Sequence, residues 1–117
     1  IIITHNLKGE YTRHRRHEEI GREVLGLWKK RELFARELWL FAYEDGGGEY
    51  LPRPRFDADL STKLPKNIWQ EKLRIITGIY GFSGHSFEAR TTPATEAFYR
   101  FTDHEIIEKQ IERRFLT

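Results

Sequence analysis

The hydrophobic positions at the start of the chain predict a buried strand, a loop and then an amphipathic helix. Ile1, Ile2 and Ile3 form a short β-branched run, and the turn-prone residues Asn6 to Gly9 end it. From His17 onward, apolar side chains recur at i, i+4, i+7 and i+8, which places them on one helix face. They are Ile20, Val24, Leu27 and Trp28.

The apolar pattern further along predicts additional strands. Leu38 to Tyr43 is almost continuously apolar, which is typical of a strand covered on both faces in a parallel sheet. Phe56 to Leu60 is compatible with a short edge strand, and Ala97 to Phe101 with another strand. We therefore expect at least three strands separated by helical segments.

Two further helices follow from the same pattern. Pro65 can open a helix that runs to about Tyr80, and its broad apolar face is expected inside the protein. The capping pattern Thr102-x-x-Glu105 is expected to open a last helix. The apolar residues of that last helix are Ile107, Ile111 and Phe115. Alternating strands and helices predict an α/β fold in which a parallel sheet is flanked by helices.

Length and composition fit one small globular domain, residues 1–117. Because the chain opens directly on an apparent strand without Met, we expect it to be the C-terminal part of a larger domain. The net charge is only +2, because 18 acidic residues accompany 20 Lys and Arg, and this argues against a general nucleic-acid binder. No apolar run is long enough to cross a membrane, and a cytoplasmic location is expected.

Candidate chemistry concentrates in the segment GEYTRHRRHEEIG, Gly9 to Gly21. His14 and His17 are three residues apart and can point the same way from a first helical turn, as metal ligands or acid–base groups. Since the chain has no cysteine, any metal would depend on His, Asp or Glu. A solvated basic loop is the simplest alternative interpretation. A second alternative is an anion site, because three arginines crowd a helix N-terminus: Arg13, Arg15 and Arg16.

The segment GEYTRHRRHEEIGREVL, with the later WQEKLRIITGIYGFSGHSFEARTTPATEAFYRF, resembles the C-terminal half of the PIG-L/LmbE-like family of zinc-dependent N-acetylglucosaminyl deacetylases. The resemblance implies a Rossmann-like fold, a zinc ion and an amino-sugar substrate. It implies that His17 is a zinc ligand and that His14 stabilises or protonates the tetrahedral intermediate. Tyr11, with a one-residue offset, matches a tyrosine that polarises the amide carbonyl. Arg13 beside it is a candidate substrate contact.

The His-Pro-Asp-Asp motif that supplies the other zinc ligands and the general base in that family is absent from this chain. His17, even with His14, falls short of the three protein ligands of a catalytic zinc site, so we expect the isolated chain to be inactive and not to bind zinc tightly. Two other functions stay open. One is a non-enzymatic α/β module that binds an anion or partner through the three arginines, and the other is a fragment that self-associates through exposed apolar surface.

Other polar and aromatic residues admit competing interpretations. His5, at the end of the first strand, is either part of the same site or a structural hydrogen-bonding residue, and we favour the latter. Lys72 is expected to snorkel to solvent rather than contact substrate. His85 and Glu88 fit no nucleophilic motif. The three tryptophans follow burial periodicity and are assigned to the core rather than to nucleic-acid binding: Trp28, Trp39 and Trp69.

Overall fold

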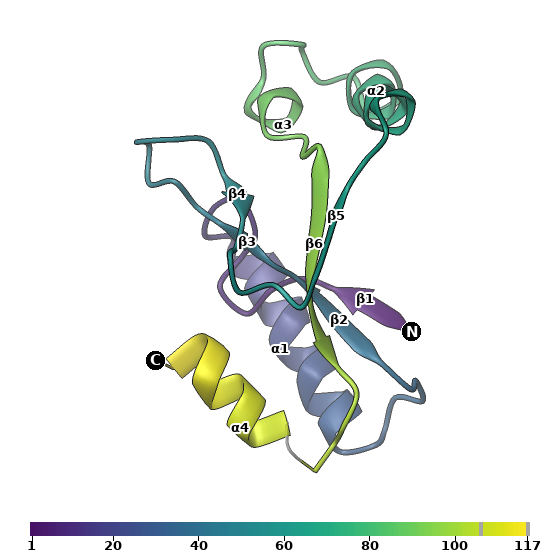
Figure 1. Cartoon of the computed structure of the whole chain (residues 1–117), viewed down its shortest axis with the longest axis vertical. Helices are drawn as coiled ribbons and strands as arrows, with labels where there is room; N and C mark the ends of the chain where they lie inside the picture. The colour runs from purple at the N-terminus through teal and green to yellow at the C-terminus, as the bar shows by residue number, and fades with distance from the viewer. Residues whose placement is uncertain (106, 117) are drawn as a thin grey trace.

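The computed structural model describes residues 1–105 and 107–116, and its centre is a four-stranded sheet (Figure 1). In spatial order the strands are β1 (Ile2–Thr4), β2 (Leu38–Phe41), β6 (Thr95–Phe101) and β5 (Leu60–Lys63). β1 and β2 are parallel, whereas β6 is antiparallel to both of its neighbours. The protein is thus a mixed α/β fold with a mixed sheet flanked by helices.

The other elements connect or follow these strands. Helix α1 joins β1 to β2, and α2 continues directly into the π-helical turn η1. Strands β3 and β4 form a separate antiparallel pair. The bounds are α1 (Arg15–Lys29), β3 (Tyr43–Glu44), β4 (Arg53–Pro54), α2 (Lys66–Arg74), η1 (Ile75–Ile79), α3 (Phe87–Arg90), α4 (Ile107–Ile111) and η2 (Glu112–Leu116). Among the helices described, none is long and apolar enough to span a membrane.

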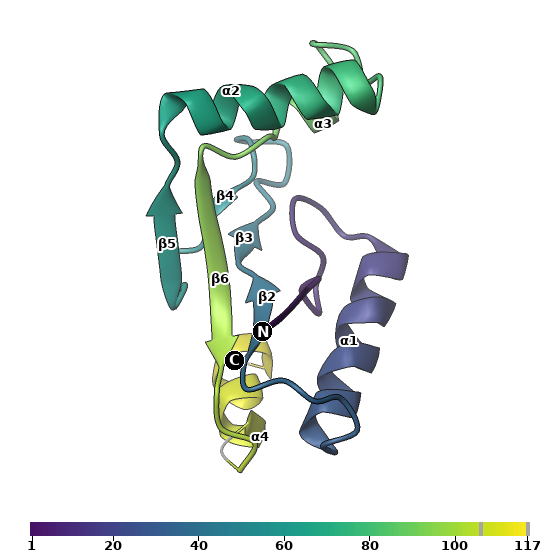
Figure 2. The ribbon, with the colours of Figure 1, turned by 90° about the vertical axis from the view of Figure 1, so that its right-hand side faces the viewer.

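One face of the sheet carries the hydrophobic core. Leu38 and Leu40 of β2 and Phe101 of β6 are fully buried and cluster with Trp28 of α1 and Ile107 of α4. Both helices therefore cover the same face. Figure 2 looks onto the opposite face, with α4 behind β6. Because successive strand residues point to opposite faces, Trp39 lies on that uncovered face and is only half-buried.

Among the described strands, the expected parallel pairing is found only between β1 and β2. The chain leaves β5 into α2 and returns from α3 to β6 at the same end of the sheet, so β5 and β6 must run antiparallel (Figure 2). β2 does carry apolar residues on both faces, as the sequence predicts, but helices cover only one of them. The edge strand expected at Phe56 to Leu60 instead occupies Leu60–Lys63.

Helix α1 forms where the sequence predicts it, but its buried face is rotated. It begins at Arg15, and its buried residues include Gly21, Leu25 and Trp28, whereas Ile20 is half exposed. The cause is the close approach of Gly21 to the chain after β1. A Cβ atom on Gly21 would lie 2.5 Å from the carbonyl oxygen of His5, so only glycine lets the helix pack this closely.

The prediction that the helix from Pro65 to Tyr80 packs inside the protein is wrong. None of the described residues of α2 or η1 is buried, and Ile79 and Tyr80 are 66 % and 72 % exposed. This helix lies across the end of β5 and β6 rather than on a face of the sheet (Figure 2). Polar contacts hold it there, such as the bond from Trp69 Nε1 to the carbonyl oxygen of Thr92 at 3.1 Å. Trp69 is accordingly half-buried.

The last helix buries two of the predicted residues, Ile107 and Phe115, and Ile111 packs partly against the core. It begins at Ile107, so the Thr102-x-x-Glu105 pattern precedes the helix. In that stretch the Asp103 carboxylate accepts a bond from the Glu105 backbone N–H.

Candidate metal centre

The loop between β1 and α1 folds back on itself and places Glu10 beside the end of β1. Asn6 organises this turn: its side chain accepts a bond from the Lys8 N–H at 2.9 Å and donates to the carbonyl oxygen of Phe41 at 2.7 Å. Gly9 has φ of +80°, a backbone conformation that favours glycine. The Asn6 N–H then donates to the Glu10 carboxylate at 2.8 Å. Backbone geometry therefore fixes Glu10 in place.

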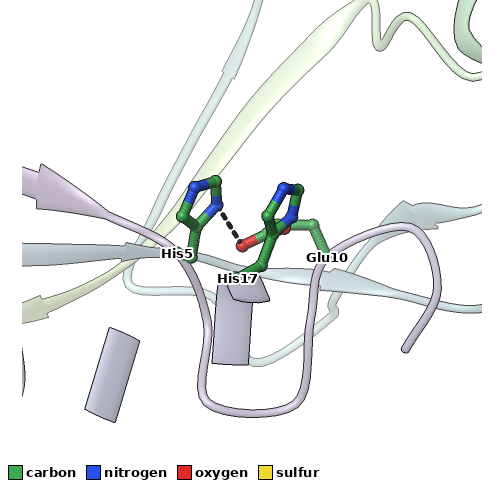
Figure 3. A group of neighbouring side chains, drawn as sticks. All are labelled: His5, Glu10 and His17. Atoms are coloured by element: carbon green, nitrogen blue, oxygen red, sulfur yellow. Dashed lines mark hydrogen bonds and ion pairs between the residues drawn. The ribbon is translucent and has the colours of Figure 1, made fainter. Parts of the chain in front are cut away.

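Glu10 joins two histidines that are distant in sequence. One carboxylate oxygen lies 3.0 Å from Nδ1 of His5 and the other 2.8 Å from Nδ1 of His17 (Figure 3). An ionised carboxylate can only accept, so a neutral imidazole bonded to it through Nδ1 carries its proton there and keeps the lone pair of Nε2. The two rings stack, with centroids 3.9 Å apart. For His5 the sequence favoured a structural hydrogen bond over a place in the site, but the ring lies beside His17 and lines the same cleft.

The three side chains offer a compact set of possible metal ligands. One ligand atom from each of His5, Glu10 and His17 lies within 4.8 Å of the others. The Glu10 side chain is only 6 % exposed, whereas the two histidines are about one third exposed. A carboxylate buried to this degree requires hydrogen-bonding or charged partners, and the imidazoles and the Asn6 N–H provide them.

His14 extends the stack on the other side of His17. Its ring lies 3.8 Å from the His17 ring, and it is the N-cap residue of α1. The His14 Nδ1 accepts a long bond, 3.4 Å, from the His17 N–H. In the neutral ring this leaves Nε2–H as a donor. The local fold thus presents three imidazoles side by side.

A cleft of about 680 Å³ opens above this cluster. The loop and α1 form one side of it, and α2, η1 and α3 form the other. Its polar lining residues are His5, Glu10, Tyr11, Thr12, His14, His17, Lys72, Glu88, Thr91, Thr92 and Glu96. Its apolar lining residues are Phe41, Ile76, Tyr80, Phe82, Phe87 and Pro93.

Tyr11 lines the cleft as a protonated hydroxyl. Burial, followed by the negative charges of Glu96 and Glu10, raises the pKa of Tyr11 well above its ordinary value. The phenol therefore keeps its proton at neutral pH and can donate a hydrogen bond to a ligand. Within residues 1–105 and 107–116, no hydrogen bond engages this hydroxyl.

Lys72 and Glu96 form an ion pair in the cleft wall. Lys72 Nζ also donates to the carbonyl oxygen of Pro93 at 3.0 Å, and Glu96 accepts a bond from the Tyr43 hydroxyl at 2.9 Å. Lys72 is thus bonded within the protein rather than extended into solvent. His85, in contrast, is exposed in the loop before α3.

The arginines of the predicted anion site do not converge on the cleft. Arg13 donates to Glu18 and lowers the pKa of that carboxyl, and it lines a different cavity, behind Glu10. Arg15 and Arg16 both pair with Glu19 on the surface of α1. Each of the three arginines therefore has a carboxylate partner in α1.

Among the residues that the sequence singled out, the structure brings Tyr11, His14 and His17 to one cleft. Glu10 is the residue that sequence reasoning missed. It lies five residues after His5 and seven before His17, and neither spacing marks a ligand motif. The available signal was that Glu10 is a carboxylate in the loop at the carboxyl end of a strand.

No protein-family model matches the chain, and searches of curated proteins and of solved structures also give no match.

Proposed function

We propose that this chain holds a divalent metal ion, Zn²⁺, at His5, Glu10 and His17, and that it belongs to a hydrolase that removes the acetyl group of an N-acetyl amino sugar. The observation that carries the proposal is the bonding of one buried carboxylate to two histidines beside an open cleft. Two imidazoles and one carboxylate are a donor set that catalytic zinc sites use.

The donor set fits Zn²⁺ in either of two ways. Glu10 can be the third ligand, which gives the three protein ligands of a catalytic zinc site. Alternatively, it can remain hydrogen-bonded to Nδ1 of both rings while their Nε2 atoms bind the ion, and the chain then supplies two ligands and the partner that orients them. The family resemblance assigns only His17 as a ligand. With His5 and Glu10 next to it, this chain offers three candidate ligands despite lacking a His-Pro-Asp-Asp segment.

The position of the cluster is consistent with a ligand site of an α/β fold. His5 directly follows β1, and Phe41, at the end of β2, lines the same cleft. Ligands of α/β proteins commonly bind beyond the carboxyl ends of parallel strands, and β1 and β2 are the parallel pair here. The Rossmann-like classification is part of this proposal and is supported by the parallel β1–α1–β2 unit.

Three of the lining residues then have chemical roles. Bound Zn²⁺ supplies Lewis-acid activation of the amide carbonyl and of water. The protonated Tyr11 hydroxyl would donate a hydrogen bond to the carbonyl oxygen, and the Nε2–H of His14 would donate one to the tetrahedral intermediate and so stabilise it. Glu88, whose carboxylate makes no hydrogen bond or ion pair within the described residues, is available to accept a proton from water and to pass it to the nitrogen of the leaving amine. Acetate and a free amino sugar are the products.

The first test is a calorimetric zinc titration of the whole chain and three variants. We expect one Zn²⁺ per chain, and we expect Glu10→Gln to lower the affinity by roughly 10- to 100-fold, the usual cost of losing a partner of a liganding histidine. His17→Ala should lower it further. His85→Ala, an exposed histidine outside the cleft, is the matched control and should bind like the natural chain. Equal affinity for all four proteins would refute the metal assignment.

The second test measures acetate release from an N-acetylglucosamine glycoside. His5, Glu10 and His17 offer the three protein ligands that His14 and His17 alone lack, so we expect an active chain in place of the inactive one that the sequence predicts. We expect release to require Zn²⁺, to be lost in His17→Ala and to be unchanged in His85→Ala. His14→Ala should keep zinc affinity and lose turnover. If the metal binds as expected but acetate is never released, the site is a metal site without the proposed hydrolase activity.

A further inference from the structure

The side of the cleft that faces the histidines is apolar and aromatic. Ile76 and Tyr80 come from η1 and its end, Phe82 follows, and Phe87 begins α3. Tyr80 is 72 % exposed, and Phe82 and Phe87 are each 41 % exposed. Exposed apolar side chains that gather in one concave patch commonly mark a ligand-binding groove or an interaction site. Here they gather opposite the candidate metal centre.

The two sides belong to one cleft, so one ligand would touch both. An amide held at His5 and His17 would extend its remaining atoms toward η1 and α3. A flat ring in the ligand can stack on an aromatic side chain or meet it edge to face, and either contact strengthens binding. The distance between the reacting group and the ring is limited by the size of the cleft, about 680 Å³, so the ring must be next to the acetylated sugar or close to it.

The groups that line the cleft argue against a phosphorylated ligand. Lys72 and Glu96 pair with each other, Glu10 is bonded to two histidines, and Glu88 adds a carboxylate without a partner among the described residues. None of the described lining residues is an arginine. Phosphate recognition depends on arginines, lysines or clustered backbone N–H groups. A neutral ligand fits this lining better.

We propose that Tyr80 and Phe82 determine substrate specificity by stacking on a flat apolar ring attached to a neutral N-acetyl amino sugar. This inference rests on the proposed function. The ring is either an aromatic group or the C–H face of a second sugar, since both present a flat apolar surface to an aromatic side chain. Phosphorylated amino sugars are disfavoured because the described lining offers no arginine and no unpaired lysine, and because Glu88 adds a negative charge.

The test compares ligands by calorimetry, with and without Zn²⁺. The probes are the methyl and p-nitrophenyl glycosides of N-acetylglucosamine, the disaccharide of two N-acetylglucosamine units, and N-acetylglucosamine phosphate. The ring-bearing probes should bind about two- to tenfold more tightly than the methyl glycoside, the gain expected for one or two aromatic contacts. A preference for the p-nitrophenyl glycoside alone indicates an aromatic group, and an equal or greater preference for the disaccharide indicates a second sugar. The phosphate should bind most weakly.

Two variants test the residues. Tyr80→Ala and Phe82→Ala should each remove most of the preference for ring-bearing probes, without changing zinc affinity. Both side chains are substantially exposed, so the variants should fold. Phe34→Ala is the matched control, because Phe34 is 95 % exposed and lies outside the cleft. It should retain the full preference.

The outcomes separate this inference from the proposed function. If zinc binds but the methyl and ring-bearing probes bind equally, or if Tyr80→Ala and Phe82→Ala behave like Phe34→Ala, the specificity inference is overturned while the metal site stands. Tight binding of the phosphate would also overturn it. If the ring preference and its loss in the variants are seen without any zinc binding, the stacking surface is supported and the proposed function fails.

Discussion

The β1–α1–β2 unit (residues 2–41) and the α2–α3 segment (residues 66–90) form the two sides of the cleft, and they differ in burial and in hydrogen bonding. In the first, buried polar groups such as Asn6 and Glu10 are bonded to backbone and to histidines, and Leu40 beneath them is fully buried. In the second, none of the described residues of α2 or η1 is buried. The first unit therefore holds chemistry in fixed geometry, and the second leaves apolar surface for a ligand.

The largest difference between the two sides should appear in core truncations. Leu40→Ala leaves a cavity under the candidate site and should lower the free energy of unfolding by about 2–5 kcal/mol. Ile79→Ala, at a position that is 66 % exposed, should change it by less than about 0.5 kcal/mol. Urea unfolding of both variants measures this. Similar losses for the two variants would mean that the α2–α3 segment packs far more tightly than the exposure of its residues indicates.

Glycine substitutions should show the next largest effect, with opposite signs on the two sides. Gly21→Ala places a Cβ against the backbone oxygens of His5 and Asn6, and we expect a loss of about 1–3 kcal/mol. Zinc affinity should fall as well, because His5 must move. Gly78→Ala meets no atom within 4 Å and should be neutral or gain up to about 1 kcal/mol from helix propensity.

A control within α1 sharpens this comparison. Gly26→Ala also meets no atom within 4 Å, although it lies in the same helix as Gly21. It should raise stability slightly and leave zinc affinity unchanged. If Gly21→Ala behaved like Gly26→Ala in both measurements, the close contact between α1 and the end of β1 would not position His5.

Ion pairs should give the smallest effect. Glu37, just before β2, bonds to Arg100 and Trp39, and the Arg100 guanidinium lowers the pKa of Glu37 from 4.5 to about 2. Since the folded-state pKa is depressed, this stabilisation is present above about pH 4.5 and is lost as the pH falls toward 2. Thermal unfolding of Glu37→Gln should therefore occur at a lower temperature than in the natural chain at pH 7, and the gap should close in acid.

The corresponding exposed pair on the other side of the cleft is Glu71 with Arg74. Glu71→Gln should leave the unfolding temperature at pH 7 almost unchanged, because an exposed i,i+3 pair contributes little. A larger effect for Glu71→Gln than for Glu37→Gln would reverse the expected order of the two sides.

Local patterns predicted the local parts of the fold. The β-branched run predicted β1, and the helical spacing predicted α1 and the last helix. The strand expected from Ala97 to Phe101 corresponds to β6. The direction of β6 and the exposure of α2 were not predictable in this way, because both depend on which distant strands pair. The prediction of which face of α1 is buried was also wrong. Gly21 lies against the backbone of His5 and Asn6, and hydrophobic periodicity does not encode such a close contact.

The candidate site was predicted in part for the same reason. His14 and His17 stand out as a pair three residues apart on a helix start, and they do lie together. Glu10 reaches them only because Asn6 and Gly9 fold the loop back, with φ of +80° at Gly9. A tertiary contact of this kind leaves no periodic signal in the sequence, so neither Glu10 nor its bond to His5 could be derived from it.

The most direct test of the central claim is a two-dimensional ¹H–¹⁵N NMR measurement of the histidine ring nitrogens during zinc addition. The chain has five histidines, which single substitutions can assign. We expect the ring nitrogens of His5 and His17 to shift together and to saturate at one Zn²⁺ per chain, while His85 and His104 do not respond. Saturating shifts at other histidines, with His5 and His17 unchanged, would contradict it.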